Sequence, residues 1–299
     1  MKPPDFEYAR PASVAEAIAR LAGANGDGKV LAGGQSLVPL LNFRLAAPSV
    51  LVDLNGIPEL AFLENADGVL RIGAMTRMRT LELDPLVRHA NPLLAAAARW
   101  VGHVQIRNRG TVGGSIAHAD PAAEVPAICV LLDAELLASG PRGERHIPAG
   151  DFFAGFLTTA LEEDEVLTEV RVPAQASGER WGFREFAHRR GDFALAGAAV
   201  TLEGPPNGPI ARARIAVFGT ADRPLRASAI EQQLVGRPMA EGTFADAAAA
   251  IAEQVATDDP RPDAAYRRTL TETMVGRALA DAASPHGATS QSDGHLEVA

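Results

Sequence analysis

Two pairs of adjacent glycines constrain this chain more than any other sequence feature. The first pair lies in Ala32-Gly33-Gly34-Gln35-Ser36-Leu37, directly after a short apolar strand, and the second in Thr111-Val112-Gly113-Gly114-Ser115. Paired glycines permit positive φ values and let a ligand approach the main chain closely. Successive N–H groups in such turns form anion-binding nests. The two loops therefore predict a clamp for a diphosphate, and the alternative is a pair of tight turns required only for packing.

The remaining sequence patterns exclude several other classes of protein. Neither glycine loop has the G-x-G-x-x-G spacing of a Rossmann site, and no G-x-x-x-x-G-K-[ST] loop occurs. The chain has 28 Lys and Arg against 37 Asp and Glu, a net charge of −9 without a dense basic block, which argues against nucleic-acid binding. No apolar run approaches the roughly 20 residues of a membrane span. We expect a cytoplasmic protein that reaches a membrane only through partners.

The single cysteine limits the redox chemistry available to this chain. One thiol excludes an intramolecular disulfide framework, a thiolate zinc site and an iron–sulfur cluster held by this chain alone. Cys129 stands in the apolar run 127–132, which predicts a small buried side chain. His118 and Asp120 lack a third ligand nearby, so no metal site is expected. Redox activity would therefore need an organic cofactor or a partner's metal.

The hydrophobic patterning predicts an α+β protein with two domains. A first domain is expected at 1–175, with lobes at about 1–57 and 58–175, followed by an α+β domain with a three-stranded sheet and helices at 179–283 and a disordered tail at 284–299. Ser13 and Glu16 form an S-x-x-E capping box for the first helix. Further strands are expected at 30–32, 50–54, 69–75, 112–117, 135–138, 145–147, 166–172, 182–187, 196–202 and 212–220, and helices at 37–45, 80–88, 92–100, 120–132, 227–235, 243–255 and 264–282.

Three motifs together resemble the FAD-binding medium subunit of the molybdenum hydroxylase family, which includes xanthine dehydrogenase and carbon monoxide dehydrogenase. They are the first glycine loop with its continuation through Arg44, the block from Gln105 to Pro121 with Glu124 beyond it, and Arg189-Arg190-Gly191-Asp192-Phe193-Ala194. The resemblance extends over residues 1 to about 283. It implies a two-lobed FAD-binding domain of the vanillyl-alcohol-oxidase-like (PCMH) type and a separate C-terminal domain.

The same resemblance implies a set of cofactor-binding residues and no catalytic residue in this chain. The expected contacts to non-covalent FAD are Leu31, Ala32, Gly33, Gly34, Gln35, Ser36, Leu37, Thr111, Val112, Gly113, Gly114, Ser115, Ala117, Asp120, Glu124, Val166, Leu167 and Asp192. The chain departs from the family at Glu185, where many members have lysine, so a cationic contact to the cofactor is in doubt there. Arg189 or Arg190 could replace it.

The family's function is electron transfer within an assembly. The resemblance implies a large molybdopterin subunit that oxidises substrate, a small subunit with two [2Fe–2S] clusters, and a dimer of such heterotrimers. Electrons would pass through FAD to an external acceptor, and the overall substrate would be an N-heterocycle, such as a nicotine-like compound or a purine, or carbon monoxide. The alternatives are a stand-alone flavin oxidase and a nucleotide-binding assembly module without turnover.

Overall fold

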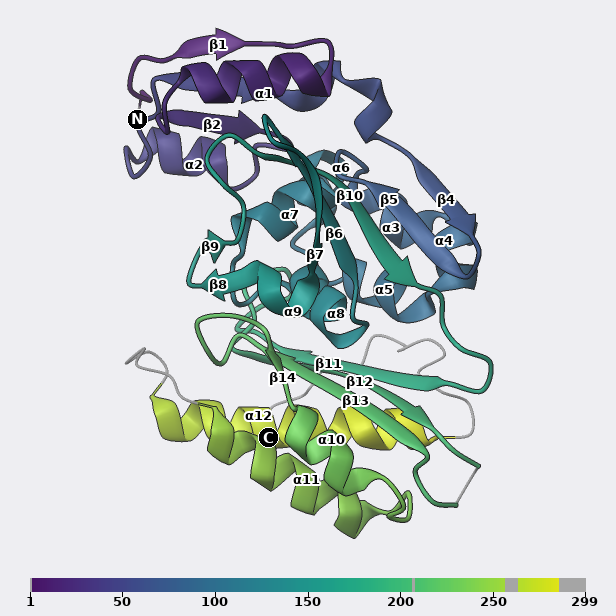
Figure 1. Cartoon of the computed structure of the whole chain (residues 1–299). Helices are drawn as coiled ribbons and strands as arrows, with labels where there is room; N and C mark the ends of the chain where they lie inside the picture. The colour runs from purple at the N-terminus through teal and green to yellow at the C-terminus, as the bar shows by residue number, and fades with distance from the viewer. Residues whose placement is uncertain (1, 206–207, 256–262, 285–299) are drawn as a thin grey trace.

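The protein is described by a computed structural model that covers residues 2–205, 208–255 and 263–284. The tail predicted for 284–299 lies, apart from Ser284, outside these residues. Figure 1 shows three layers of structure that follow one another along the chain: a small first lobe, a larger second lobe, and a sheet whose outer side is covered by helices.

The first lobe is a parallel sheet with strand order β1-β3-β2. Its elements are β1 (Glu7–Ala9), α1 (Val14–Gly23), β2 (Gly28–Leu31), α2 (Leu37–Asn42), β3 (Val50–Asp53) and the 3-10 turns η1 (Leu54–Gly56) and η2 (Pro58–Leu60). The predicted capping box is confirmed, because Ser13 Oγ accepts from the N–H of Glu16 while Glu16 Oε2 accepts from the N–H of Ala12. The sequence reading missed β1, which is only three residues long.

The second lobe is an antiparallel sheet with strand order β4-β5-β10-β6-β7, and short helices pack against it. Its strands are β4 (Leu63–Ala66), β5 (Val69–Gly73), β6 (Glu135–Gly140), β7 (Gly143–Pro148) and β10 (Val166–Pro173), with the small pair β8 (Phe153–Gly155) and β9 (Thr158–Thr159). Its helices are α3 (Met78–Leu83), α4 (Pro85–Ala90), α5 (Pro92–Ala98), α6 (Val104–Arg109), α7 (Val112–His118), α8 (Glu124–Leu131) and α9 (Ala149–Phe152).

Three sequence expectations in the second lobe are wrong. The strand expected at 112–117 is the helix α7, which begins because Thr111 Oγ1 accepts from the N–H of Gly114. The single helix expected at 80–88 is interrupted at Asp84, because Pro85 disfavours helical geometry in the residue before it. Asp120 does not cap α8. Its carboxylate accepts from the N–H of Ala122 in a turn, and the helix starts at Glu124.

The C-terminal domain is an antiparallel sheet, order β11-β12-β13-β14, with its helices on one face. The elements are β11 (Arg180–Phe186), β12 (Ala196–Glu203), β13 (Arg212–Phe218), β14 (Leu225–Arg226), α10 (Ser228–Leu234), α11 (Glu241–Gln254) and α12 (Ala264–Ala283). The three long strands and three helices match the prediction, and the two-residue β14 adds a fourth strand. Helix α12 packs on β11 and β12, while α5 and α8 of the second lobe lie against the opposite face of the sheet (Figure 1).

One continuous hydrophobic core joins the second lobe to the C-terminal domain. Phe183 and Phe218 from the C-terminal sheet stack at 5.8 Å between ring centroids, and Trp100 of the second lobe lies 6.1 Å from Phe183. Both phenylalanines belong to the same buried cluster as the apolar residues of α8. A smaller cluster is built around Ala17, Leu21 and Val52 of the first lobe, and it also includes Met75 and Val166 of the second lobe. The second lobe and the C-terminal domain are therefore packed as one body.

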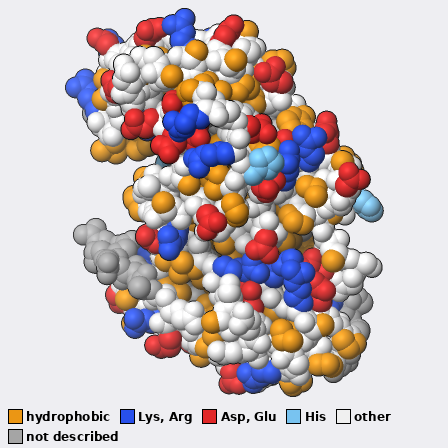
Figure 2. Space-filling model, in the orientation of Figure 1, with side chains coloured by type: hydrophobic (Ala, Val, Ile, Leu, Met, Phe, Trp, Pro, Cys, Tyr) orange, Lys and Arg blue, Asp and Glu red, His pale blue; other side chains and the backbone are white. Residues whose placement is uncertain are grey.

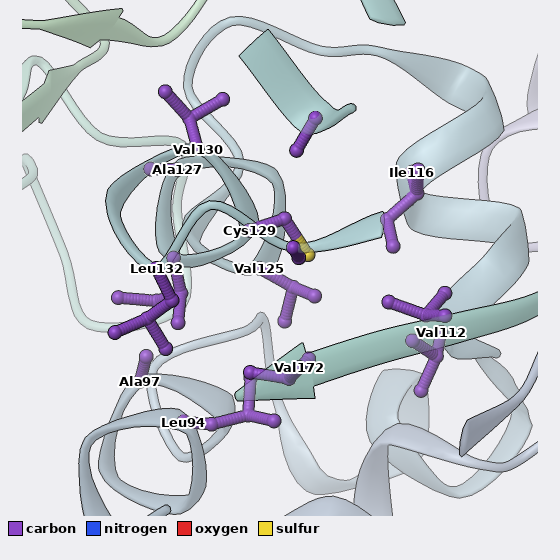
Figure 3. Close-up of a cluster of buried hydrophobic side chains, with 14 of the residues drawn as sticks. Leu94, Ala97, Val112, Ile116, Val125, Ala127, Cys129, Val130, Leu132 and Val172 are labelled. Atoms are coloured by element: carbon purple, nitrogen blue, oxygen red, sulfur yellow. The ribbon is translucent and has the colours of Figure 1, made fainter. Parts of the chain in front are cut away.

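The predicted burial of Cys129 is confirmed. Every residue of α8 is buried, and Cys129 lies among the side chains of Val112, Ile116 and Val172 (Figure 3). Burial raises the pKa of its thiol to about 12. Because the thiolate is the reactive form, this cysteine is inert in the folded protein.

The shared core predicts that a single truncation destabilises both domains together. Phe218→Ala removes a fully buried ring and should lower the free energy of unfolding by about 3–5 kcal/mol. Urea titration followed by tryptophan fluorescence and far-UV circular dichroism should show one transition at a lower midpoint by both probes. Val235→Ala, at a residue that is 53% exposed, is the control and should change stability by less than about 0.5 kcal/mol. Two separated transitions in the wild type would contradict the shared core.

Candidate functional site

The two glycine loops meet where the first lobe joins the second. A Cβ atom added at Gly33 would lie 2.4 Å from the carbonyl oxygen of Arg109 and 2.7 Å from the Cα of Gly110. A Cβ at Gly114 would lie 3.3 Å from the Cβ of Ala32. The backbones of the two loops are therefore in direct contact, which only glycine permits at Gly33.

The first loop presents a run of free hydrogen-bond donors. Within the described ranges, the backbone N–H groups of Gly33, Gly34, Gln35, Ser36 and Leu37 have no acceptor, and neither does the hydroxyl of Ser36. Gly34 has a φ of +73°, and the Gln35 amide donates to the carbonyl of Gly33. Unpaired main-chain donors in series are the chemistry that binds a phosphate group.

The second loop differs from the first, because its main-chain donors are already used. The N–H of Val112 donates to Thr76 and that of Gly113 to Ala74, while Gly114 and Ser115 donate to the hydroxyl and the carbonyl of Thr111. Gly113 is also required by packing, since a Cβ there would lie 2.4 Å from that of Ala74. The main-chain clamp expected from both sides is therefore one-sided, and the second loop contributes a wall with the half-buried side chain of Ser115.

The other predicted contacts fall into three groups by burial. Leu31, Ala32 and Leu37 are half-buried beside the first loop. The side chains of Val112, Val166 and Leu167 are in the hydrophobic core, and Val166 belongs to the first-lobe cluster on which Ala32 packs. Ala117 is exposed, on the face of α7 opposite the core.

Asp192 makes no hydrogen bond to either glycine loop within the described residues. It lies exposed between β11 and β12, and its only hydrogen bond in the described chain runs from its N–H to the carbonyl of Arg189. The neighbouring Gly191 packs against the ring of His103, just before α6, and the Arg190 guanidinium lies 5.5 Å from the centre of the Trp100 ring. This segment therefore reaches the second lobe near the start of α6.

Two carboxyl groups, those of Glu124 and Glu185, interact electrostatically across the boundary between the second lobe and the C-terminal domain. Glu124 begins α8, and burial raises the pKa of its carboxyl from 4.5 to about 7, with the Asp120 charge raising it and that of Arg107 lowering it. Burial and then the Glu124 charge raise the pKa of Glu185 well above 4.5. No described group bonds to Glu185 Oε2, which is shielded from solvent. Burial and their like charges therefore both favour the protonated forms of these two groups.

Sequence reasoning missed three features of this region. Glu185 was identified only as a departure from the family pattern, not as a neighbour of Glu124. Asn55 and Arg77 donate hydrogen bonds to the carbonyl groups of Ala32 and Arg109 beside the glycine pairs. Asn55-Gly56 indicates no more than a turn in the sequence, and Arg77 stands in no motif.

The donor set fits a dinucleotide better than a metal ion. Five free main-chain N–H groups and a serine hydroxyl are donors, which bind phosphate oxygens and repel cations. Across the described ranges, no three His, Cys, Asp or Glu side chains are grouped so that they could hold a metal ion. No helix in the described part of the chain is long and apolar enough to cross a membrane.

Comparison with known families identifies the class of protein that this fold and site define. A family described as "FAD binding domain in molybdopterin dehydrogenase" matches residues 4–175, and one described as "CO dehydrogenase flavoprotein C-terminal domain" matches residues 181–282. The chain belongs to this flavoprotein family of molybdenum-containing oxidoreductases, whose cofactor is FAD.

Individual relatives match over nearly the whole chain. It is 40% identical to the 6-hydroxypseudooxynicotine dehydrogenase complex subunit alpha of Paenarthrobacter nicotinovorans, covering 99% of this chain and 100% of the relative. It is 42% identical to the carbon monoxide dehydrogenase medium chain of Hydrogenophaga pseudoflava, covering 93% and 97%.

Solved structures agree with these relatives. A chain of carbon monoxide dehydrogenase from Hydrogenophaga pseudoflava superimposes with a TM-score of 0.91 at 42% identity, covering 94% of this chain and 98% of that one. A chain of quinoline 2-oxidoreductase from Pseudomonas putida 86 gives 0.90 at 39% identity, covering 95% and 98%. The expected family and the expected α+β fold class are confirmed.

The buried acid pair predicts a pH dependence of stability. A folded-state pKa raised above 4.5 means that the folded protein keeps a proton that the unfolded chain releases, so stability falls as pH rises from about 4.5 through about 7. For Glu124 the loss is roughly 3 kcal/mol. Glu185→Gln removes the repelling charge, so the melting temperature should fall less between pH 5 and pH 8 than in the wild type.

The matched control for this experiment is Glu272→Gln, which changes an exposed glutamate on α12. It should leave the pH profile of the melting temperature unchanged. Calorimetry that finds the same profile in Glu185→Gln as in the wild type would contradict an electrostatic interaction between these two carboxyl groups.

Proposed function

We propose that this chain is the FAD-carrying electron-transfer subunit of a molybdenum hydroxylase complex in the cytoplasm. FAD supplies the redox chemistry when bound, taking electrons from [2Fe–2S] clusters on a small partner subunit and passing them to an external acceptor. A large molybdopterin subunit would oxidise the substrate, and the complex would be a dimer of such heterotrimers. The observation that carries the proposal is the run of free N–H groups from Gly33 to Leu37 in a chain of this family.

The role of this chain is to bind and orient the cofactor without a covalent link. The first loop would hold the diphosphate through its main-chain donors and Ser36, and the second loop would form the facing wall with Thr111, Gly114 and Ser115. The cofactor would then lie between the lobes 1–57 and 58–175, with the domain 179–283 packed on the second of them. We propose Asp120 and Glu124 as further groups of this site, where carboxyl groups accept hydrogen bonds from hydroxyls.

The surface of this chain beside the glycine loops is suited to binding a partner subunit. Large hydrophobic side chains are exposed on α2, on the segment after it, and on α6: Val38, Phe43, Leu45, Val104 and Ile106. The ranges 28–52 and 85–119, which contain these elements, hold no Asp or Glu in a chain that has 37. On the face shown in Figure 2, by contrast, basic and acidic side chains are interspersed. An apolar and locally basic surface favours contact with an acidic protein partner.

The substrate of the complex is proposed to be an N-heterocycle. Relatives at about 40% identity include subunits named for 6-hydroxypseudooxynicotine and caffeine dehydrogenases, and a structural relative is quinoline 2-oxidoreductase. Carbon monoxide is the second candidate, because the medium chain of carbon monoxide dehydrogenase is equally similar.

Substitution of one loop glycine should separate cofactor binding from folding. In Gly33→Ala the added methyl group would overlap the carbonyl of Arg109 and force the loops apart. We expect FAD affinity to fall roughly ten- to a hundredfold, since a misplaced donor loses charge-assisted hydrogen bonds. Flavin content per chain and far-UV circular dichroism measure the two effects. Gly23→Ala, where the new Cβ would meet no atom within 4 Å, is the control, and equal flavin content in both variants would contradict the assignment.

The electron-transfer role is tested by reduction of the flavin with and without partner subunits. The purified chain should be yellow, and its absorbance near the flavin maximum should bleach under substrate only after the iron–sulfur and molybdenum subunits are added. Direct reduction by substrate would indicate a stand-alone oxidase instead. A colourless chain that does not take up added FAD would indicate an assembly module without turnover.

A further inference from the structure

The two glycine loops are connected by a chain of hydrogen bonds that crosses from the first lobe to the second. Asn55 Nδ2 donates to the carbonyl of Ala32 at 2.8 Å, and Asn55 Oδ1 accepts from Arg77 Nη2 at 2.7 Å. The other arm of the same guanidinium, Nη1, donates to the carbonyl of Arg109 at 2.5 Å. One asparagine thus holds the carbonyl group next to the first glycine pair, and one arginine holds the carbonyl of Arg109, four residues before Gly113.

Both side chains are themselves held in place from behind. Asp53 Oδ1 accepts from the backbone N–H of Asn55 at 2.9 Å and from its side-chain amide at 2.6 Å, and the hydroxyl of Tyr8 donates to the other oxygen of this buried carboxylate. Arg77 stands in an isolated antiparallel bridge with Thr111, with the N–H of Met78 donating to the carbonyl of Gly110. The guanidinium is half-buried, and burial lowers its pKa.

The direction of these bonds determines which way the first loop points its donors. In a trans peptide the C=O and N–H bonds lie in one plane and point in opposite directions. Because the carbonyl of Ala32 is turned toward Asn55, the N–H of Gly33 is turned away from it and begins the run of free donors. The carbonyl of Arg109 lies against Gly33, and Arg77 neutralises its negative end there. Without that neutralisation, the carbonyl dipole would oppose an anion at the loop.

We propose that Asn55 and Arg77 form a two-armed clasp that orients both glycine loops for the cofactor diphosphate. They act as positioning residues, through the loop carbonyls, and this role rests on the proposed FAD site. Nothing in the sequence motifs or in the family matches assigns it. The clasp needs a planar fork, since a lysine has a single donor centre that cannot reach Asn55 Oδ1 and the Arg109 carbonyl together.

The test measures FAD dissociation constants of the full chain by fluorescence titration, with ADP as a second ligand that has the diphosphate and lacks the flavin. We expect Arg77→Gln and Asn55→Ala to weaken both ligands, roughly ten- to a hundredfold for Arg77→Gln. Arg77→Lys should remain nearly as weak as Arg77→Gln. The double variant should be no more than about threefold weaker than Arg77→Gln alone, because both residues act through one connection.

The matched control is Arg79→Gln. Arg79 lies two residues further along, pairs with Glu82 and bonds to neither loop, so its removal should change FAD affinity by less than about threefold. Circular dichroism checks that each variant is folded. If an Arg77 variant does not fold, Asn55→Ala still tests the proposal, because Asn55 is exposed.

Three outcomes would overturn the clasp. The first is an unchanged FAD affinity in both single variants. The second is a wild-type affinity in Arg77→Lys, which would mean that the positive charge alone is sufficient. The third is a double variant in which the affinity losses of the single variants multiply. A wild-type chain that binds neither FAD nor ADP would instead refute the proposed function itself, so the two failures are distinguishable.

Discussion

The structure depends on one close contact between two stretches of main chain. Gly33 lies against the carbonyl of Arg109, at a separation that leaves no room for any side chain. This contact brings a loop from a parallel sheet next to a helix–turn–helix segment from an antiparallel one. The candidate site therefore lies at the boundary between two lobes that have separate sheets. Neither lobe contains it alone, and each glycine pair serves packing and ligand access together.

The two loops differ in the number of main-chain donors that they leave unpaired, and local hydrogen bonding explains the difference. After β2 the chain forms no regular structure until α2, so successive N–H groups remain unpaired. After Gly110 the chain soon enters helix α7. The N–H groups of its first turn donate to Thr111 and to the carbonyls of Ala74 and Thr76, which follow β5. The proposed ligand contacts therefore belong to the first loop, whose donors remain free, and the second loop supports it.

The sequence contained much of the fold and part of the site. Local signals were sufficient where they were chemically specific: the Ser13 cap of the first helix and the buried run around Cys129. They failed at 112–117, because the β-branched Val112 and Ile116 favour a strand and two glycines disfavour a helix until the Thr111 cap is considered. The family motifs indicated both loops.

The tertiary part of the site was not predictable from local patterns. Glu124 and Glu185 are 61 positions apart and meet only because α8 packs on the C-terminal sheet. Asn55, Arg77 and Arg109 are joined by side-chain bonds over 22 and 32 positions, and none of these residue types signals its partner in a single sequence. Long-range pairing of this kind depends on the whole fold, so it becomes visible only in the structure.

The arrangement of the hydrophobic clusters has a mechanical consequence. The linker near residue 175 marks the end of one family match, yet the second lobe and the C-terminal domain share a core across it. The smaller cluster joins residues of the first lobe to Met75 and Val166 of the second. Both boundaries along the chain are therefore spanned by buried side chains, and a displacement at one end of the molecule is transmitted to the other through close-packed contacts.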